Sequence, residues 1–329
     1  MEFFKSFRHR WNMKIRISRT IRVTLKSFIL KIKKFSLNDS ILIISSPRGG
    51  STWLTEILNS IDKTIINWEP FHPNYGALST SINGGDALYV PESQTYGLLR
   101  NDVQEILKFN KNTKFTLRFL KIKDILSAEI VITKSVRINN LIPWLIKHID
   151  LKRKPIYLLR HPIATAFSHI KAFDEEKTIS RYIAPNFMHN ERFIEHEDYI
   201  NSLKTKIERQ VAIWCLNNIP VIHHPDHGKK WLVVYYENLV MDPEDVTIKL
   251  LNEIGINVDM ATISKIDFKK PSQTDIQQDY KTNSILQLEK WKHWLSDVEL
   301  DNIQKIFDHF DFLLYSTKSC FPHTSKIND

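Results

Sequence analysis

The stretch ILIISSPRGGSTWL, residues 41–54, decides the fold, because an apolar run enters a glycine-containing turn and then the start of a helix. A strand, a turn and a helix in this order are typical of loops that hold anions. Backbone N–H groups point into such a loop, and the helix N-terminus adds partial positive charge. Gly49 and Gly50 permit close approach of the ligand, and Ser51 and Thr52 add hydroxyl donors. We therefore expect an anion-binding loop here.

The lysine that closes the phosphate loop of kinases and ATPases is missing. Gly50 stands in its position, and the apolar run Ile130–Lys134 ends in lysine rather than in an acid that could hold Mg²⁺. A terminal sulfuryl group carries one negative charge where a phosphoryl group carries about two, so one or two cationic side chains could replace a metal. Arg48 is placed to offer two hydrogen bonds to such a group. The alternative is that Arg48 is a surface residue of a plain turn.

A second candidate anion site lies in IYLLRHPIATAFS, residues 156–168. An apolar run ends in Arg160, Pro162 opens a helix, and Ser168 lies eight residues beyond the arginine. Strand ends of one polarity form the ligand crevice of an open α/β sheet. Two anion sites on one edge predict a ligand with phosphates at two separate positions. The alternatives are that Arg160 forms a salt bridge and that Ser168 is an ordinary helix serine.

The pattern of apolar runs predicts an α/β fold with three layers, similar to P-loop proteins, in which helices flank a central, mostly parallel five-stranded sheet. The runs expected to be strands are Ile41–Ser45, Thr64–Trp68, Ile130–Lys134, Ile156–Arg160 and Leu232–Tyr236. Helical patterns lie between them at Thr52–Ile61, Asn139–Ile149, Ile163–Phe173 and Ser202–Asn218. A further helix is expected after Asp242 and Pro243, with Gly255 at its end.

The net charge of +9 is concentrated in an N-terminal arm. Residues 1–36 hold eleven lysines or arginines and one acid, which leaves 35 bases and 36 acids for residues 37–329. We therefore expect a basic arm, residues 1–36, followed by one catalytic domain, residues 37–329. Apolar residues recur in the arm at helical spacing. One interpretation is an amphipathic helix on anionic lipid, and the alternative is a helix packed on the domain or a partly disordered arm.

The arm carries no signal peptide and no apolar run long enough for a membrane span, so we expect a cytoplasmic protein, with peripheral membrane contact as the further possibility. The two cysteines, Cys215 and Cys320, give neither a disulfide framework nor a metal site. No recognised nucleic-acid-binding fold accompanies the basic residues, and we expect no nucleic-acid partner.

Four segments together resemble the PAPS-dependent sulfotransferases, whose donor is 3′-phosphoadenosine 5′-phosphosulfate. SSPRGGSTWL resembles their 5′-phosphosulfate loop, and LLRHPIATAFS resembles their 3′-phosphate motif. VVYYENLVMDPEDVTIKLLNEIGI resembles the strand, turn and capped helix that follow in that family. WEPFHP resembles the Glu-Pro element of carbohydrate sulfotransferases. The resemblance covers about residues 41–255 in the right order and is closest to bacterial carbohydrate-type members.

The resemblance implies PAPS as the donor cosubstrate, no metal, and an acceptor hydroxyl, which the carbohydrate-type similarity places on a saccharide. Arg48 would stabilise charge on the sulfuryl group and the leaving oxygen, Trp53 would stack on adenine, and Arg160 with Ser168 would hold the 3′-phosphate. The alternative for Trp53 is a core tryptophan. The donor-binding residues implied in this way are Pro47, Arg48, Gly49, Gly50, Ser51, Thr52, Trp53, Arg160 and Ser168.

Glu69 is the first candidate for the catalytic base, because it follows an expected strand and so lies at the same edge as Arg48. His72 is its rival, since many cytosolic members use a histidine. Lys134, at another strand end, is a candidate contact for the sulfuryl group or the acceptor. Lys269 and Lys270 are either a phosphate contact or a solvated turn.

Two long segments, residues 72–98 and 174–199, are candidates for acceptor recognition because long loops in compact domains are often binding loops. Two other functions stay open. The first is a metal-dependent small-molecule kinase with an unusual loop. The second is a non-enzymatic module that binds lipid or polyanion through the basic arm and keeps a vestigial nucleotide site.

Overall fold

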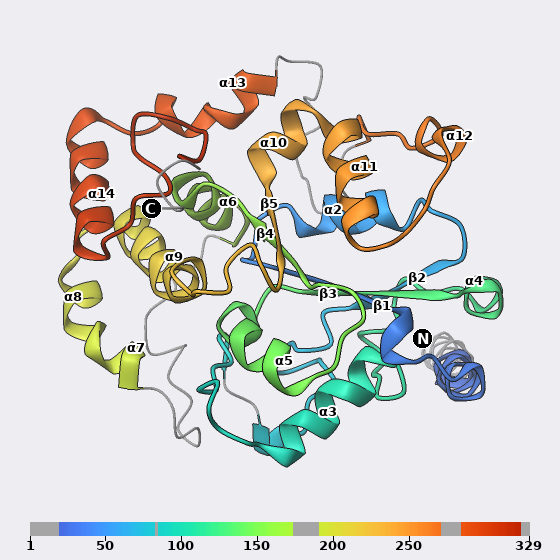
Figure 1. The fold of residues 1–329 in the computed structure, drawn as a ribbon. Coiled ribbons are helices and arrows are strands. Elements are labelled where there is room, and N and C mark those ends of the chain that lie inside the picture. The colour runs from blue at the N-terminus through green and yellow to red at the C-terminus, as the bar shows by residue number, and fades with distance from the viewer. Residues whose placement is uncertain (1–19, 83–84, 174–190, 271–283, 324–329) are drawn as a thin grey trace, which may run out of the picture.

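The computed structural model describes residues 20–82, 85–173, 191–270 and 284–323, and the sheet in this part has five parallel strands in the order β2-β3-β1-β4-β5 (Figure 1). Each strand agrees with an expected apolar run to within one residue at either end. The expected fold class is therefore confirmed. The strands are β1 (Ser40–Ser45), β2 (Thr64–Trp68), β3 (Ile130–Ser135), β4 (Ile156–Leu159) and β5 (Leu232–Tyr235).

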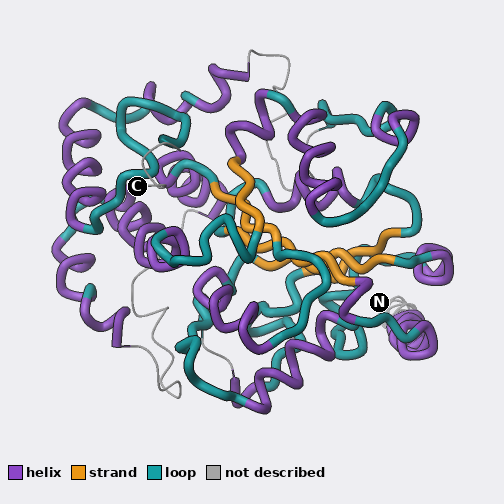
Figure 2. Tube along the Cα trace, viewed as in Figure 1, coloured by secondary structure: helices purple, strands orange, loops and turns teal. Residues whose placement is uncertain are grey.

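Helices cover both faces of the sheet. Successive side chains of the central strand β1 point to opposite faces, so they pack in two separate clusters. Ile41 and Ile43 pack in one cluster with residues of α2 (Ser51–Leu58) and α11 (Pro243–Glu253). Leu42 and Ile44 join the other cluster. Its helices include α5 (Ile142–His148), α6 (Pro162–Phe173) and α9 (Lys206–Ile222). Figure 2 shows the strands in the middle with helices above and below them.

The remaining helices lie around these layers. Residues 20–33 are helical as well, and none of the helices in the described part is long and apolar enough to cross a membrane. The other helices are α3 (Gly97–Leu107), α4 (Ile122–Ser127), α7 (Glu191–Glu195), α8 (Glu197–Ser202), α10 (Tyr236–Met241), α12 (Met260–Ile263), α13 (Ser284–Leu288) and α14 (Asp297–His309).

Helix boundaries follow local capping. The expected helix over Ser202–Asn218 begins later, at Lys206, because Thr205 and Glu208 form a reciprocal capping box there. The helix after Asp242 is confirmed, since the Asp242 side chain accepts the N–H of Asp245 at 3.2 Å.

Several expectations fall on residues outside the described part. These are the first half of the arm, residues 1–19, the segment 174–190 of the second long loop, and the Pro-Ser pair that follows Lys270. The strands that are described all run in one direction, so their carboxyl ends meet at one edge of the sheet. That edge carries the loop after β1, Glu69 after β2, and Arg160 after β4.

Candidate active site

The loop Ser46–Gly50 connects β1 to α2 and is shaped by its two glycines. Gly50 has a φ of 93°, and a Cβ on it would lie 2.3 Å from the ring of Tyr236. A Cβ on Gly49 would lie 2.2 Å from the hydroxyl of Ser45. Arg48 also has a left-handed backbone, with a φ of 67°. The predicted turn is therefore tightly folded against the end of β5 and leads directly into the N-terminus of α2.

The two expected anion sites are joined by hydrogen bonds. Arg48 Nε donates to the Ser168 hydroxyl at 3.1 Å, and an Arg160 guanidinium N–H donates to the Arg48 carbonyl at 2.9 Å. Sequence reasoning treated Arg48 as part of one site and Arg160 with Ser168 as another. The structure places all three in one cluster at the carboxyl edge of the sheet.

Tyr236 belongs to this cluster, and sequence reasoning missed it. Its ring lies under the guanidinium of Arg160, with 4.6 Å from the guanidinium carbon to the ring centroid. The half-buried Trp53 meets the same ring edge-on, 6.0 Å between centroids. Arg160 Nε is buried and has no hydrogen-bond partner among the described residues. Tyr236 follows β5 directly, so its place at the strand end was the available signal.

Glu237 forms hydrogen bonds next to the end of β4. Its carboxylate accepts the backbone N–H of His161 at 2.8 Å and the hydroxyl of Tyr315 at 2.9 Å. Burial raises the pKa of Glu237 above its usual range. These bonds fix the residue next to Arg160, so Glu237 has a structural role.

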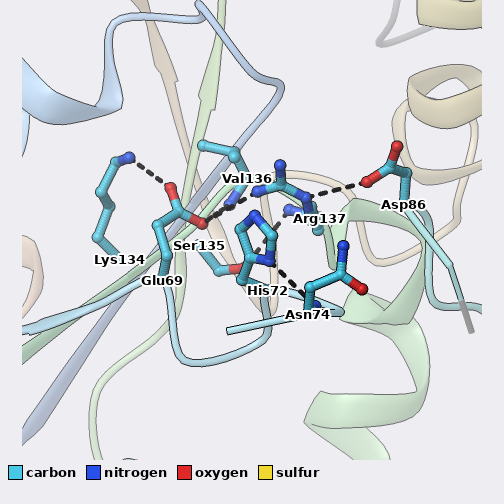
Figure 3. A network of polar contacts seen from close by, with 8 residues as sticks. All are labelled: Glu69, His72, Asn74, Asp86, Lys134, Ser135, Val136 and Arg137. Carbon is cyan, nitrogen blue, oxygen red and sulfur yellow. Dashed lines mark hydrogen bonds and ion pairs between the residues drawn. The ribbon is translucent and has the colours of Figure 1, made fainter. Parts of the chain in front are cut away.

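Glu69 follows β2 and is 4% exposed (Figure 3). Lys134 Nζ lies 2.5 Å from one carboxylate oxygen, and the backbone N–H of Val136 donates to the other at 3.2 Å. A guanidinium nitrogen of Arg137 lies 3.8 Å from that second oxygen. The parallel register, in which Trp68 faces Lys134, brings these groups together. The result is a buried carboxylate in contact with two cationic side chains and a backbone donor.

His72 lies beside this cluster and is half buried (Figure 3). Burial, and secondarily the charge of Arg137, lower the pKa of His72 below its usual value. Its Nδ1 accepts the backbone N–H of Asn74 at 3.2 Å. The neutral ring therefore carries its proton on Nε2, which makes that nitrogen a donor.

A cavity opens next to both clusters. Its wall includes Ser46 and Pro47 from the loop after β1, and Val136 and Arg137 beyond β3. Pro47 therefore lines this cavity, whereas the sequence analysis places it among the residues that bind the donor. Asp86, in the first long loop, also lines it and accepts a hydrogen bond from Arg137 Nε at 3.2 Å. The first long loop therefore forms part of the wall of this cavity.

Amide side chains also line the cavity. Asn139 donates from Nδ2 to Asn218 at 2.8 Å and to Ser46 at 3.2 Å. Its Oδ1 is buried without a hydrogen-bond partner in the described part of the chain, and so is Nε2 of Gln210 on α9. One unused acceptor and one unused donor therefore lie in the wall of a cavity that also contains Trp214 and Ile213. Sequence reasoning did not single out either amide.

The profile of the sulfotransferase domain family matches residues 38–318. The chain belongs to this family. The assignment confirms the expected enzyme class, that of the PAPS-dependent sulfotransferases. No curated protein matches the chain.

Solved sulfotransferase structures are similar to the chain in fold alone. Mouse sulfotransferase SULT7A1, complexed with PAP, is 13% identical over 84% of this chain and 86% of that one, with a TM-score of 0.43. A sulfotransferase domain from the curacin biosynthetic pathway is 15% identical over 84% and 98%, with a TM-score of 0.45. Retinol dehydratase, in a complex with retinol and PAP, is 12% identical over 83% and 81%, with a TM-score of 0.39.

Proposed function

We propose that this sulfotransferase moves the sulfuryl group of PAPS to a saccharide hydroxyl, with Glu69 as the base and Arg48 as the electrostatic stabiliser. The bond between sulfur and the 5′-phosphate oxygen breaks, and a new bond forms between sulfur and the acceptor oxygen. Glu69 takes the acceptor proton, and adenosine 3′,5′-bisphosphate leaves. Positioning and preorganised charge supply the rate enhancement.

The joined cluster of Arg48, Arg160 and Ser168 is the observation that carries this proposal. Arg160 has a buried donor without a described partner, which fits an anionic ligand. The loop before α2 leaves no room for side chains at its glycines, which fits a ligand held by backbone N–H groups. A 3′-phosphate held by Ser168 and Arg160 would take over the hydroxyl that Arg48 now contacts. Arg48 would then be directed to the sulfuryl group.

Glu69 is favoured over His72 by the hydrogen bonds of both residues. Neutral His72 has its proton on Nε2 and its Nδ1 engaged by Asn74, so it has no nitrogen ready to accept a proton. Glu69 is paired with a cation and lies at the strand end beside the cavity wall formed by Val136. Lys134, paired with Glu69, is the second cation for the sulfuryl group.

The cavity supports a saccharide acceptor. A sugar hydroxyl both donates and accepts hydrogen bonds, so adjacent hydroxyls can satisfy Asn139 Oδ1 and Gln210 Nε2 at once. The side chain of Trp214 offers an apolar surface against which the C–H face of a sugar can pack.

The proposal includes the division into an arm, residues 1–36, and a catalytic domain, residues 37–329. It also includes a cytoplasmic location. Free, buried Cys215 and Cys320 suit a reducing compartment.

Transfer of labelled sulfuryl groups from PAPS to a panel of saccharides and phenols tests the proposal. We expect Glu69→Gln to lower kcat on saccharides by about 10²- to 10⁴-fold, with the affinity for adenosine 3′,5′-bisphosphate unchanged. Asp102→Asn breaks another largely buried ion pair, with Lys111, and serves as the matched control. Unchanged kcat in Glu69→Gln would refute the role of the base, and transfer to phenols alone would refute the saccharide.

A further inference from the structure

The helix formed by residues 20–33 is fastened to the catalytic domain along one side. Leu30 is fully buried in a cluster that includes Leu117. Lys26 Nζ donates to the Leu117 carbonyl at 3.4 Å, and Lys33 Nζ donates to a backbone carbonyl of α4 at 2.8 Å. The cluster includes Ile65 of β2 and Val131 of β3, so this helix is packed on the catalytic domain.

The opposite side of the same helix is apolar and exposed. Ile21, Leu25, Phe28 and Ile32 are 60%, 42%, 59% and 62% exposed. Their spacing of four, three and four residues places them in one stripe, and at about 100° per residue Leu30 lies roughly opposite that stripe. In Figure 1 this helix lies at the margin of the molecule, beside the label N and near α4. A row of four large exposed apolar side chains is typical of an interaction surface.

The charge of this segment has one sign. Arg22 and Lys31 flank the stripe, Lys26 and Lys33 lie on the side that contacts the domain, Lys34 follows the helix, and residues 20–36 contain no acid. Residues 37–329 carry 35 bases and 36 acids and so are almost neutral. The charge complementary to this surface is therefore negative.

We propose that the exposed stripe of residues 21, 25, 28 and 32 docks the enzyme on an anionic lipid bilayer. The helix lies in the plane of the interface, its four apolar side chains enter the headgroup boundary, and the flanking Arg22 and Lys31 contact acidic headgroups. A second copy of the chain suits the surface less well, because pairing two such helices would bring cations against cations with no acid to balance them. The docking is independent of sulfuryl transfer.

Cosedimentation of the full chain with vesicles tests this proposal. Phosphatidylcholine vesicles with about 30% phosphatidylserine present the anionic surface, and pure phosphatidylcholine vesicles are the neutral comparison. We expect the original chain to bind the anionic vesicles at least about tenfold more tightly than the neutral vesicles. The double variant Phe28→Gln/Ile32→Gln should bind the anionic vesicles at least about tenfold more weakly than the original chain. Met260→Gln/Val298→Gln removes two side chains that are 60% and 69% exposed elsewhere, and should bind as the original chain does.

Three results would overturn the proposal. The first is no binding to anionic vesicles, and the second is binding that the stripe variant leaves unchanged. The third is self-association, measured by light scattering, that the stripe variant abolishes while vesicle binding is absent, which would identify a second copy as the partner. Binding of adenosine 3′,5′-bisphosphate, measured on the same samples, shows that the variants are folded and reports on the catalytic site separately.

Discussion

Among single residues, Gly50 is subject to two restrictions in the loop after β1. Its φ of 93° lies in the left-handed region, and its Cα faces the ring of Tyr236 so closely that a Cβ would lie 2.3 Å from that ring. Tyr236 in turn packs against Arg160 and Trp53. A side chain at position 50 would therefore displace an aromatic ring that packs against Arg160.

We predict that Gly50→Ala lowers the free energy of unfolding and weakens binding of adenosine 3′,5′-bisphosphate. Gly228→Ala is the matched control, because Gly228 has a φ of 70° and nothing within 4 Å of an added Cβ. Both variants bear the cost of a left-handed alanine, and only Gly50→Ala adds a clash, which costs about 1–3 kcal/mol more. Denaturant unfolding and calorimetry measure the two effects. Equal losses in both variants would contradict the contact with Tyr236.

At the level of elements, His161 ties the junction of β4 and α6 to the C-terminal segment. Its Nε2 donates to the Ser316 carbonyl at 3.1 Å, its Nδ1 accepts the N–H of Ile163 at 3.2 Å, and its ring stacks on Trp291 at 4.8 Å. Complete burial lowers the pKa of His161 to about 3. Both ring nitrogens are used in the neutral form, so protonation would break the bond to Ile163.

This arrangement predicts a pH dependence of stability. Between about pH 3 and 6.5 the unfolded chain binds a proton at His161 that the folded protein does not bind. The contribution of neutral His161 to the free energy of unfolding is therefore complete above about pH 6.5 and is lost as the pH falls. We expect the free energy of unfolding to fall by about 1 kcal/mol from this residue between about pH 7.5 and 5.5. Denaturant unfolding of His161→Gln should show a correspondingly smaller decrease, while exposed His293→Gln should behave as the original chain. Identical pH profiles for the original chain and His161→Gln would refute this assignment.

For the whole molecule, the sheet could be predicted because parallel strands are buried on both faces. Each strand is therefore a short apolar run that differs clearly from the helices around it. The start of α9 was misplaced because a capping box at Thr205 and Glu208 outweighs the helical pattern before it. Strand order was not readable from the chain, and contacts between strand ends depend on it.

The candidate site, like the fold, could be predicted from the sequence only in part. Arg48, Arg160 and Glu69 could be singled out from the sequence as candidates because each follows a strand, where side chains reach the crevice at the edge of an α/β sheet. The hydrogen bond between Arg48 and Ser168 could not be predicted, since it depends on how closely the loop after β1 approaches α6. Asn139 and Gln210 were missed because amides in helical segments have no local pattern that marks them as cavity residues.

Calorimetric titration with adenosine 3′,5′-bisphosphate beside 5′-AMP, with and without Mg²⁺, tests the central claim most directly. The joined cluster of Arg48, Arg160 and Ser168 predicts binding of the bisphosphate without metal, and binding of AMP at least about tenfold weaker, a difference of about 1.4 kcal/mol. Equal affinities, or no binding, would mean that Arg160 and Ser168 do not hold a 3′-phosphate. Binding that requires Mg²⁺ would favour the kinase alternative, and either result would contradict the proposed transfer.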